Sequence, residues 1–175
     1  ALGWGGLLIG SKEMGRAALG LGPLGAESIL LWAALATLVI HLLQGGFFLA
    51  RIRLGIQESR ILAQILPRTG REKALFAFLS LAAGVGEELA FRGFAIPALA
   101  LVTGSLPGGV LLSSMAFGLL HGYQGWIGVL RTGLMGLVLA IIFVVSGSLW
   151  PVILAHTILD LVSGLILGDT LLKER

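Results

Sequence analysis

Long apolar segments separated by short polar or glycine-rich stretches dominate the chain. The first covers 28–50, where His41 and Gln44 are the strongly polar side chains, and four more follow at 74–102, 108–122, 126–146 and 149–168. As an α-helix, a segment of about 20 residues rises about 30 Å, the thickness of the hydrocarbon core of a bilayer. The pattern predicts an all-α fold, a polytopic integral membrane helical bundle with about five or six membrane segments.

The same pattern divides the chain into five parts. We expect an N-terminal interfacial or truncated segment at 1–27 and a first membrane span at 28–50. A basic loop at 51–73 leads into a four-segment membrane core at 74–168, and a short tail follows at 169–175.

Basic residues concentrate in the loop at 51–73. This loop holds half of the twelve Lys and Arg residues, namely Arg51, Arg53, Arg60, Arg68, Arg71 and Lys73. Loops rich in Lys and Arg stay on the cytoplasmic side, so we expect this loop and the C-terminus to face the cytoplasm of a cell membrane, the inner or plasma membrane. Apolar positions within the loop also predict a short amphipathic helix on the membrane surface.

The composition agrees with a membrane protein. Hydrophobic residues make up 57% and charged residues 12%, with a mean hydropathy of +0.99. A soluble domain of this length has too little interior for so much apolar surface. The net charge of +3 comes mostly from the basic loop, so we expect no nucleic-acid partner. The absence of cysteine excludes disulfides and a cysteine nucleophile.

Only a few ionisable side chains interrupt the membrane core. Residues 74–168 contain seven, namely Glu87, Glu88, Arg92, His121, Arg131, His156 and Asp160. A charge at the bilayer centre costs at least about 2.5–3.5 kcal/mol on insertion scales, so such residues face the bundle interior and usually mark function. Arg131 lies five residues after Trp126 and can reach the membrane surface with its long side chain.

The first cluster of polar residues is Glu87, Glu88 and Arg92. On a helix, Glu88 and Arg92 lie about 40° apart and can pair, whereas Glu87 points elsewhere. Glu87 is therefore left without a local partner, which makes it a candidate general base. The alternative is an ion-pair network that only fixes the packing of helices.

Two further clusters each contain a histidine. His121 follows Phe117 by four residues, and His156 precedes Asp160 by four, which places the imidazole and the carboxyl group on one helix face. Each histidine alone is more often a satisfied interior residue than a catalyst. Together with an unpaired glutamate they suggest activation of a water molecule and stabilisation of an oxyanion.

Other intramembrane hydrolytic chemistries fit less well. The chain has no HExxH helix of the zinc-protease kind. Only Asp160 could belong to an aspartyl dyad, and no serine of the core has a base placed beside it by the sequence.

The three clusters resemble the CAAX-protease and bacteriocin-processing family, also called CPBP or Abi. Its motifs EExxxR, FxxxH and HxxxN or HxxxD occur here in that order as Glu87-Glu88 with Arg92, Phe117 with His121, and His156 with Asp160. The resemblance covers about 70–168. It implies an intramembrane glutamate endopeptidase like the type II CAAX prenyl endopeptidases, with 74–168 as the catalytic core.

The resemblance also implies roles for the site residues. Glu87 and His121 would activate water, His156 and residue 160 would form the oxyanion site, and Glu88, Arg92 and Phe117 would support them. No cofactor is expected, but zinc stays open because Glu87, His121 and His156 could serve as its ligands.

Asp160 departs from the asparagine of the eukaryotic prenyl proteases. An ionised aspartate cannot donate a hydrogen bond to an oxyanion, so we expect Asp160 either to be protonated or, as we prefer, to orient His156 through a hydrogen bond.

Glu87 and His121 must lie at the same depth in the membrane to share a water molecule. If the helix starts at residue 74, Glu87 lies about 20 Å along it, whereas His121 lies near the inner end of its own segment. A break at 84–86, a helix that starts above the membrane surface or a longer third helix would reconcile the two.

The sequence thus favours an endopeptidase that hydrolyses a peptide or membrane-protein substrate, prenylated or not, within the lipid bilayer. Two alternatives stay open, a non-proteolytic immunity or scaffold protein on the same fold and a transporter or proton relay built on the buried ionisable groups. The oligomeric state is not predicted.

Overall fold

The protein is a bundle of apolar helices. The computed structural model describes residues 19–56 and 60–166, and all regular structure within them is helical. Three helical stretches are long and apolar enough to cross a membrane, Ala26–Leu54, Gly70–Thr103 and Gly122–Ser146, and two shorter apolar helices are Leu106–Leu120 and Trp150–Ile166. The predicted all-α polytopic membrane bundle is confirmed, and the protein is an integral membrane protein.

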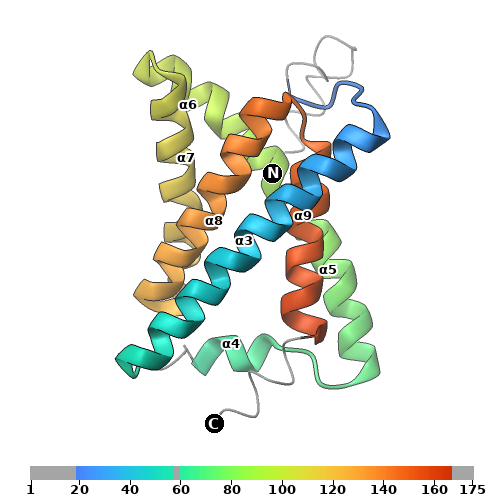
Figure 1. Ribbon diagram of the computed structural model, residues 1–175, viewed down its shortest axis with the longest axis vertical. Helices are drawn as coiled ribbons and strands as arrows, with labels where there is room; N and C mark the ends of the chain where they lie inside the picture. Colours follow the sequence, from blue (N-terminus) through green and yellow to red (C-terminus); the bar gives the residue numbers. More distant parts are fainter. Residues whose placement is uncertain (1–18, 57–59, 167–175) are drawn as a thin grey trace.

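Figure 1 shows how the helices are arranged. In chain order they are α3 (Ala26–Leu54), α4 (Arg60–Ile65), α5 (Gly70–Glu88), η1 (Leu89–Ala95), α6 (Ile96–Thr103), α7 (Leu106–Leu120), η2 (Gly122–Gln124), α8 (Gly125–Ser146), α9 (Trp150–Leu161) and η3 (Val162–Ile166). The short helix α4 lies across one end of the bundle, within the loop predicted to carry a surface helix. The tail predicted at 169–175 and most of the segment predicted at 1–27 lie outside the described residues.

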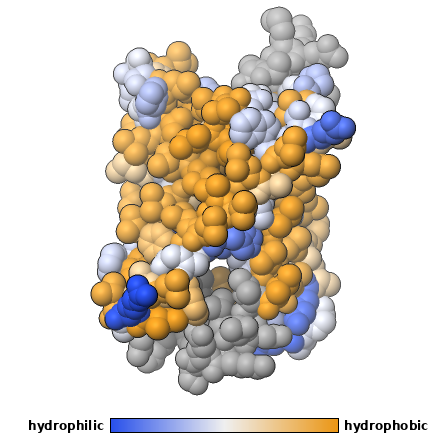
Figure 2. All heavy atoms as spheres, viewed as in Figure 1, coloured by the Kyte–Doolittle hydropathy of each residue, from blue (hydrophilic) through white to orange (hydrophobic). Residues whose placement is uncertain are grey.

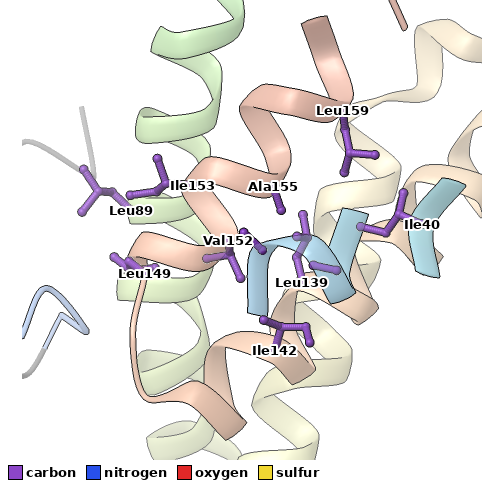
Figure 3. Packing of buried hydrophobic residues seen from close by; sticks show 11 residues of the cluster. Ile40, Leu89, Leu139, Ile142, Leu149, Val152, Ile153, Ala155 and Leu159 are labelled. Carbon is purple, nitrogen blue, oxygen red and sulfur yellow. The ribbon is translucent and has the colours of Figure 1, made fainter. Parts of the chain in front are cut away.

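Helix α9 stands at the centre of the hydrophobic core. It packs against both α3 and α5, and its buried side chains contact those of α3, α8 and η1. Figure 3 shows this cluster around α9, with members that include Ile40, Leu89, Leu139, Ile142, Leu149, Val152, Ile153, Ala155 and Leu159. The third polar motif is carried by this central helix.

The outer surface is apolar as well. Leu31 on α3, Phe78 on α5 and Leu120 on α7 are each 71% exposed, and hydrophobic atoms cover most of the face in Figure 2, while hydrophilic atoms lie mainly toward its two ends. For a monomer in water, so large an exposed apolar surface would be unusual. It is the surface expected of helices that contact lipid.

Helix α5 begins four residues earlier than the hydrophobic pattern predicts. The Thr69 hydroxyl accepts a hydrogen bond from the Glu72 N–H, and the Glu72 carboxylate accepts one from the Thr69 N–H, which is a capping box. In Figure 1 the first turns of α5 reach the level of α4, beyond the ends of α7 and α8. The helix runs unbroken through 84–86 and α7 ends at Leu120, so of the three arrangements expected from the sequence the structure has a helix α5 that starts beyond the ends of α7 and α8.

A π-helix, η1, follows Glu88 directly and leads into α6. Pro97 lies just beyond it and has no N–H, and in an α-helix its ring would clash with the carbonyl group four residues earlier. The wider π-helical turn relieves this clash, as a hydrogen bond from the Ile96 N–H to the Phe91 carbonyl oxygen shows. The first polar motif therefore spans the junction between α5 and η1.

Candidate active site

The three polar motifs come together inside the bundle from three helical stretches. Glu87 and Glu88 end α5, and Arg92 lies in η1. His121 caps the C-terminus of α7, and His156 lies in α9, one turn before Asp160. The contacts below join α5, η1, α7, α8 and α9 at a single place.

Glu88 and Arg92 form the buried ion pair that their spacing predicts. Arg92 Nη1 donates to Glu88 Oε1 over 2.9 Å, and the two side chains are 1% and 0% exposed. Arg92 Nη2 also donates to the carbonyl oxygen of Gly136 on α8, at 3.0 Å. The guanidinium group lies 4.6 Å from the centre of the Phe117 ring, a cation–π contact. Arg92 thus links η1, α7 and α8 beside the glutamates.

Glu88 also holds His156. His156 Nδ1 lies 2.7 Å from the same Glu88 Oε1 that accepts from Arg92. A carboxylate paired with arginine is an acceptor, so His156 Nδ1 carries a proton and donates it. In the neutral ring Nε2 then has the lone pair, and in the imidazolium Nε2–H is a donor. Glu88 therefore fixes both the orientation and the tautomer of His156.

Two further carboxyl groups approach the other nitrogen of this ring. Glu87 Oε2 and Asp160 Oδ2 each lie 3.8 Å from His156 Nε2. Neither distance is a direct hydrogen bond, but one water molecule can bond both partners across such a gap. The hydrogen bond that we expected between His156 and Asp160 is not formed, because Asp160 Oδ2 lies 3.8 Å from Nε2, and the ring is oriented instead by the hydrogen bond from Nδ1 to Glu88.

His121 shares the same tautomer for a different reason. Its Nδ1 lies 2.8 Å from the Phe117 carbonyl oxygen, which can only accept, so Nδ1–H donates and Nε2 is available. The Phe117 ring contacts both imidazoles, with centroid distances of 4.8 Å to His121 and 6.1 Å to His156. Phe117 is thus the spacer between the two histidines, a role that its place in the second motif did not reveal.

The glutamates have unused hydrogen-bonding capacity. Glu87 Oε2 and Glu88 Oε2 are both buried and have no hydrogen-bond partner among the described residues. The Glu87 side chain is nevertheless 35% exposed and that of Asp160 36%, so each carboxyl side chain is partly accessible from outside the bundle. A buried, unpartnered carboxylate oxygen beside an imidazole nitrogen is suited to binding and deprotonating a water molecule.

The arrangement does not provide a metal cluster. Within the described residues no group of three or more His, Asp and Glu side chains has the geometry to hold a metal ion. Glu87 and His156 face each other, but His121 does not join them as a third ligand. The described residues therefore do not form a zinc site.

Sequence reasoning missed two partners of the site. The Gly136 carbonyl oxygen, which accepts from Arg92, could not be predicted from the sequence, since every residue has a backbone carbonyl group. Ser113, whose hydroxyl donates to the Phe91 carbonyl oxygen at 3.0 Å, joins α7 to η1. Ser113 could have been found from its place one turn before Phe117, on the face of the segment that carries the second motif.

The fold and the site define an integral membrane protein with a largely buried glutamate–histidine centre. The sequence model of the family described as type II CAAX prenyl endopeptidase Rce1-like matches residues 70–162, more than half of the chain. The chain belongs to this family of CAAX-type intramembrane proteases, and protease activity is assigned to it at that level. No curated protein and no solved structure matches the chain.

Proposed function

We propose that the protein is an intramembrane endopeptidase in which Glu87 and the two histidines activate water for hydrolysis of a peptide bond. The observation that carries the proposal is the position of Glu87 Oε2, buried, unpartnered and 3.8 Å from His156 Nε2. Membership of the CAAX protease family supports the same reaction class.

In the proposed mechanism Glu87 is the general base. Water held between Glu87 and the imidazole Nε2 atoms loses a proton to Glu87 as its oxygen attacks the substrate carbonyl carbon. His156, in its imidazolium form, donates from Nε2 to the oxyanion that develops, while Glu88 stabilises the positive ring through Nδ1. Glu87 then delivers its proton to the leaving nitrogen as the C–N bond breaks.

The remaining residues take supporting roles. His121 presents Nε2 as the second imidazole toward the water, as the family resemblance implies. Asp160 lies 3.8 Å from His156 Nε2 and balances the charge of the imidazolium, a role that an ionised carboxylate can fill although it cannot donate a hydrogen bond. Arg92 holds the Glu88 carboxyl group in place through its hydrogen bond to Oε1.

The substrate that we infer is a peptide or membrane-protein segment cleaved near the cytoplasmic surface of the cell membrane. The orientation rests on the basic residues at the end of the bundle where α3 ends and α5 begins. The family's name points to a prenylated C-terminal peptide, whereas none of the site contacts described above specifies a prenyl group.

The test is cleavage of fluorogenic reporter peptides by the purified, reconstituted protein. Glu87→Gln keeps the shape of the side chain and removes the base, so we expect cleavage to be lost. Glu27→Gln makes the same chemical change at an exposed position in the first turn of α3, far along the chain, and cleavage should be unchanged.

Each reporter is supplied with and without a farnesyl group, which separates substrate choice from reaction class. Cleavage that persists in Glu87→Gln contradicts the mechanism. Failure of the wild-type protein to cleave either reporter or a panel of unmodified peptides favours the scaffold alternative.

A further inference from the structure

A second feature, remote from the glutamate–histidine centre, lies where α4 turns into α5. A groove with a volume of about 240 Å³ is formed there between the end of α4 and the first turns of α5. Its lining is mainly apolar, with Ile65, Leu66, Pro67, Leu75, Phe76 and Leu79, and its polar members are Gln64 and the acid Glu72. Leu75 and Leu79 are 60% and 62% exposed, so this wall of the groove faces the surroundings of the bundle.

Positive charge lies at the mouth of this groove. Arg68 follows Pro67 directly, and Arg71 precedes Leu75 and Leu79 by one and two helical turns, so Arg71 shares their helix face. Both arginines are exposed, and neither forms an ion pair with an acid among the described residues. The charge of Arg68 also acts on the Glu72 carboxylate, so Arg71 is the more available of the two guanidinium groups to an anion.

The acid nearest to them is already engaged. Glu72 Oε2 accepts hydrogen bonds from the backbone N–H groups of Arg68 and Thr69, at 2.7 and 3.2 Å. Its carboxylate is thus turned to the backbone as part of the capping box. Lys73, half-buried in the next position, adds a further positive charge, so the mouth of the groove is cationic overall.

We propose that this groove binds an anionic phospholipid. The phosphate group would lie on Arg68 and Arg71, and one acyl chain would follow the stripe of Leu75 and Leu79. A charged headgroup attached to a hydrocarbon chain matches a cationic mouth above an apolar, lipid-facing wall, and basic residues at the membrane surface attract anionic lipids. This lipid site is independent of the proposed proteolysis.

The experiment measures, by native mass spectrometry in neutral detergent, how tightly two lipids bind to the full chain. The lipids are phosphatidylglycerol and phosphatidylcholine with the same acyl chains. We expect tighter binding of phosphatidylglycerol. Arg71→Ala should weaken it about fivefold, and Arg68→Ala with Arg71→Ala about 25-fold if the charges act independently. Arg53→Ala removes the same charge from an exposed position at the far end of α3 and should change it less than twofold.

A second pair of variants tests the apolar part of the groove. Leu79→Trp partly fills the groove and should weaken phosphatidylglycerol binding, whereas Leu81→Trp, at another exposed position of α5, should not. Thermal unfolding in the same detergent checks that each variant is folded. Equal binding of the two lipids, or equal losses in Arg71→Ala and Arg53→Ala, would overturn the proposal. So would displacement of the lipid by millimolar inorganic phosphate, because the site would then recognise phosphate alone.

Discussion

Glu88, rather than Asp160, is the carboxylate that holds His156, with 2.7 Å between Glu88 Oε1 and His156 Nδ1 and 3.8 Å between Asp160 Oδ2 and His156 Nε2. The same Glu88 oxygen accepts from Arg92. This chain of arginine, glutamate and histidine orients the ring from inside the bundle, as a carboxylate does for a catalytic histidine in other hydrolases.

The two carboxylates should therefore differ when each is replaced by its amide. Glu88→Gln keeps an acceptor for Nδ1 but loses the charge that stabilises the imidazolium, and we expect kcat to fall about 10–100-fold with little change in KM. Asp160→Asn should retain most of the activity, since no direct hydrogen bond is lost and Glu88 still compensates the charge of the imidazolium. Steady-state kinetics on the cleaved reporter measure both. Equal losses in the two variants would contradict the assignment of Glu88 as the positioning residue.

Replacing Arg92 should lower the stability of the protein more than it weakens binding of the reporter peptide. Arg92→Met leaves the fully buried Glu88 without its charged partner, and removing one member of a buried pair costs about 3–5 kcal/mol. Thermal unfolding in detergent should show a large fall in the midpoint. In the double variant Glu88→Leu with Arg92→Met part of that stability should return, because neither member of the ion pair is left without the other, although His156 Nδ1 loses its acceptor and activity stays lost. A double variant as unstable as the single one would contradict the ion-pair account.

The crossing of α7 and α8 beside His121 leaves no room for a side chain. A Cβ atom at Gly118 would lie 2.7 Å from the Val129 carbonyl oxygen and 2.9 Å from Gly133 Cα, both backbone atoms that cannot rotate away. We expect Gly118→Ala to cost about 1–3 kcal/mol of unfolding free energy and to lower activity, since His121 lies three residues further on.

Gly46→Ala on α3 is the matched control, because a Cβ there meets no atom within 4 Å. It should leave stability unchanged or raise it by up to about 1 kcal/mol through helix propensity. Chemical or thermal unfolding of both variants in one detergent provides the comparison. The account of the crossing fails if the two variants behave alike.

Metal chelation distinguishes the two ways in which water could be activated. Because the described residues do not gather three ligands, we expect 1,10-phenanthroline to leave reporter cleavage unchanged and the purified protein to contain less than stoichiometric zinc. Elemental analysis and cleavage assays before and after dialysis against chelator give the answer. Loss of activity that added zinc restores would assign Glu87, His121 and His156 as ligands instead.

The local parts of the site follow from the sequence, and the long-range parts do not. The pairing of Glu88 with Arg92 depends only on helical spacing, and it was predicted and observed. The contact of Glu88 with His156 joins residues 68 positions apart, so it depends on how α5 packs against α9. Spacing within one helix could not show that Glu88 binds Nδ1 of the ring while Asp160 stays 3.8 Å from Nε2.

Two local signals in the sequence set helix limits that differ from those of the hydrophobic pattern. Thr69 and Glu72 have the spacing of a capping box, which would have placed the start of α5 at Gly70. Pro97, shortly after the first motif, signals a disturbed helical turn, which the structure resolves as the π-helix η1. The apolar periodicity located the membrane segments, whereas these polar and proline signals set their limits.

The central position of α9 has a consequence for the newly synthesised chain. This helix supplies His156 and is the last α-helix in the order of synthesis within the described residues. Until α9 has been inserted and has packed between α3 and α5, Glu88 can pair only with Arg92. Glu87 then has no histidine of α9 near its carboxyl group. A partly made chain on the ribosome therefore lacks the assembled glutamate–histidine centre.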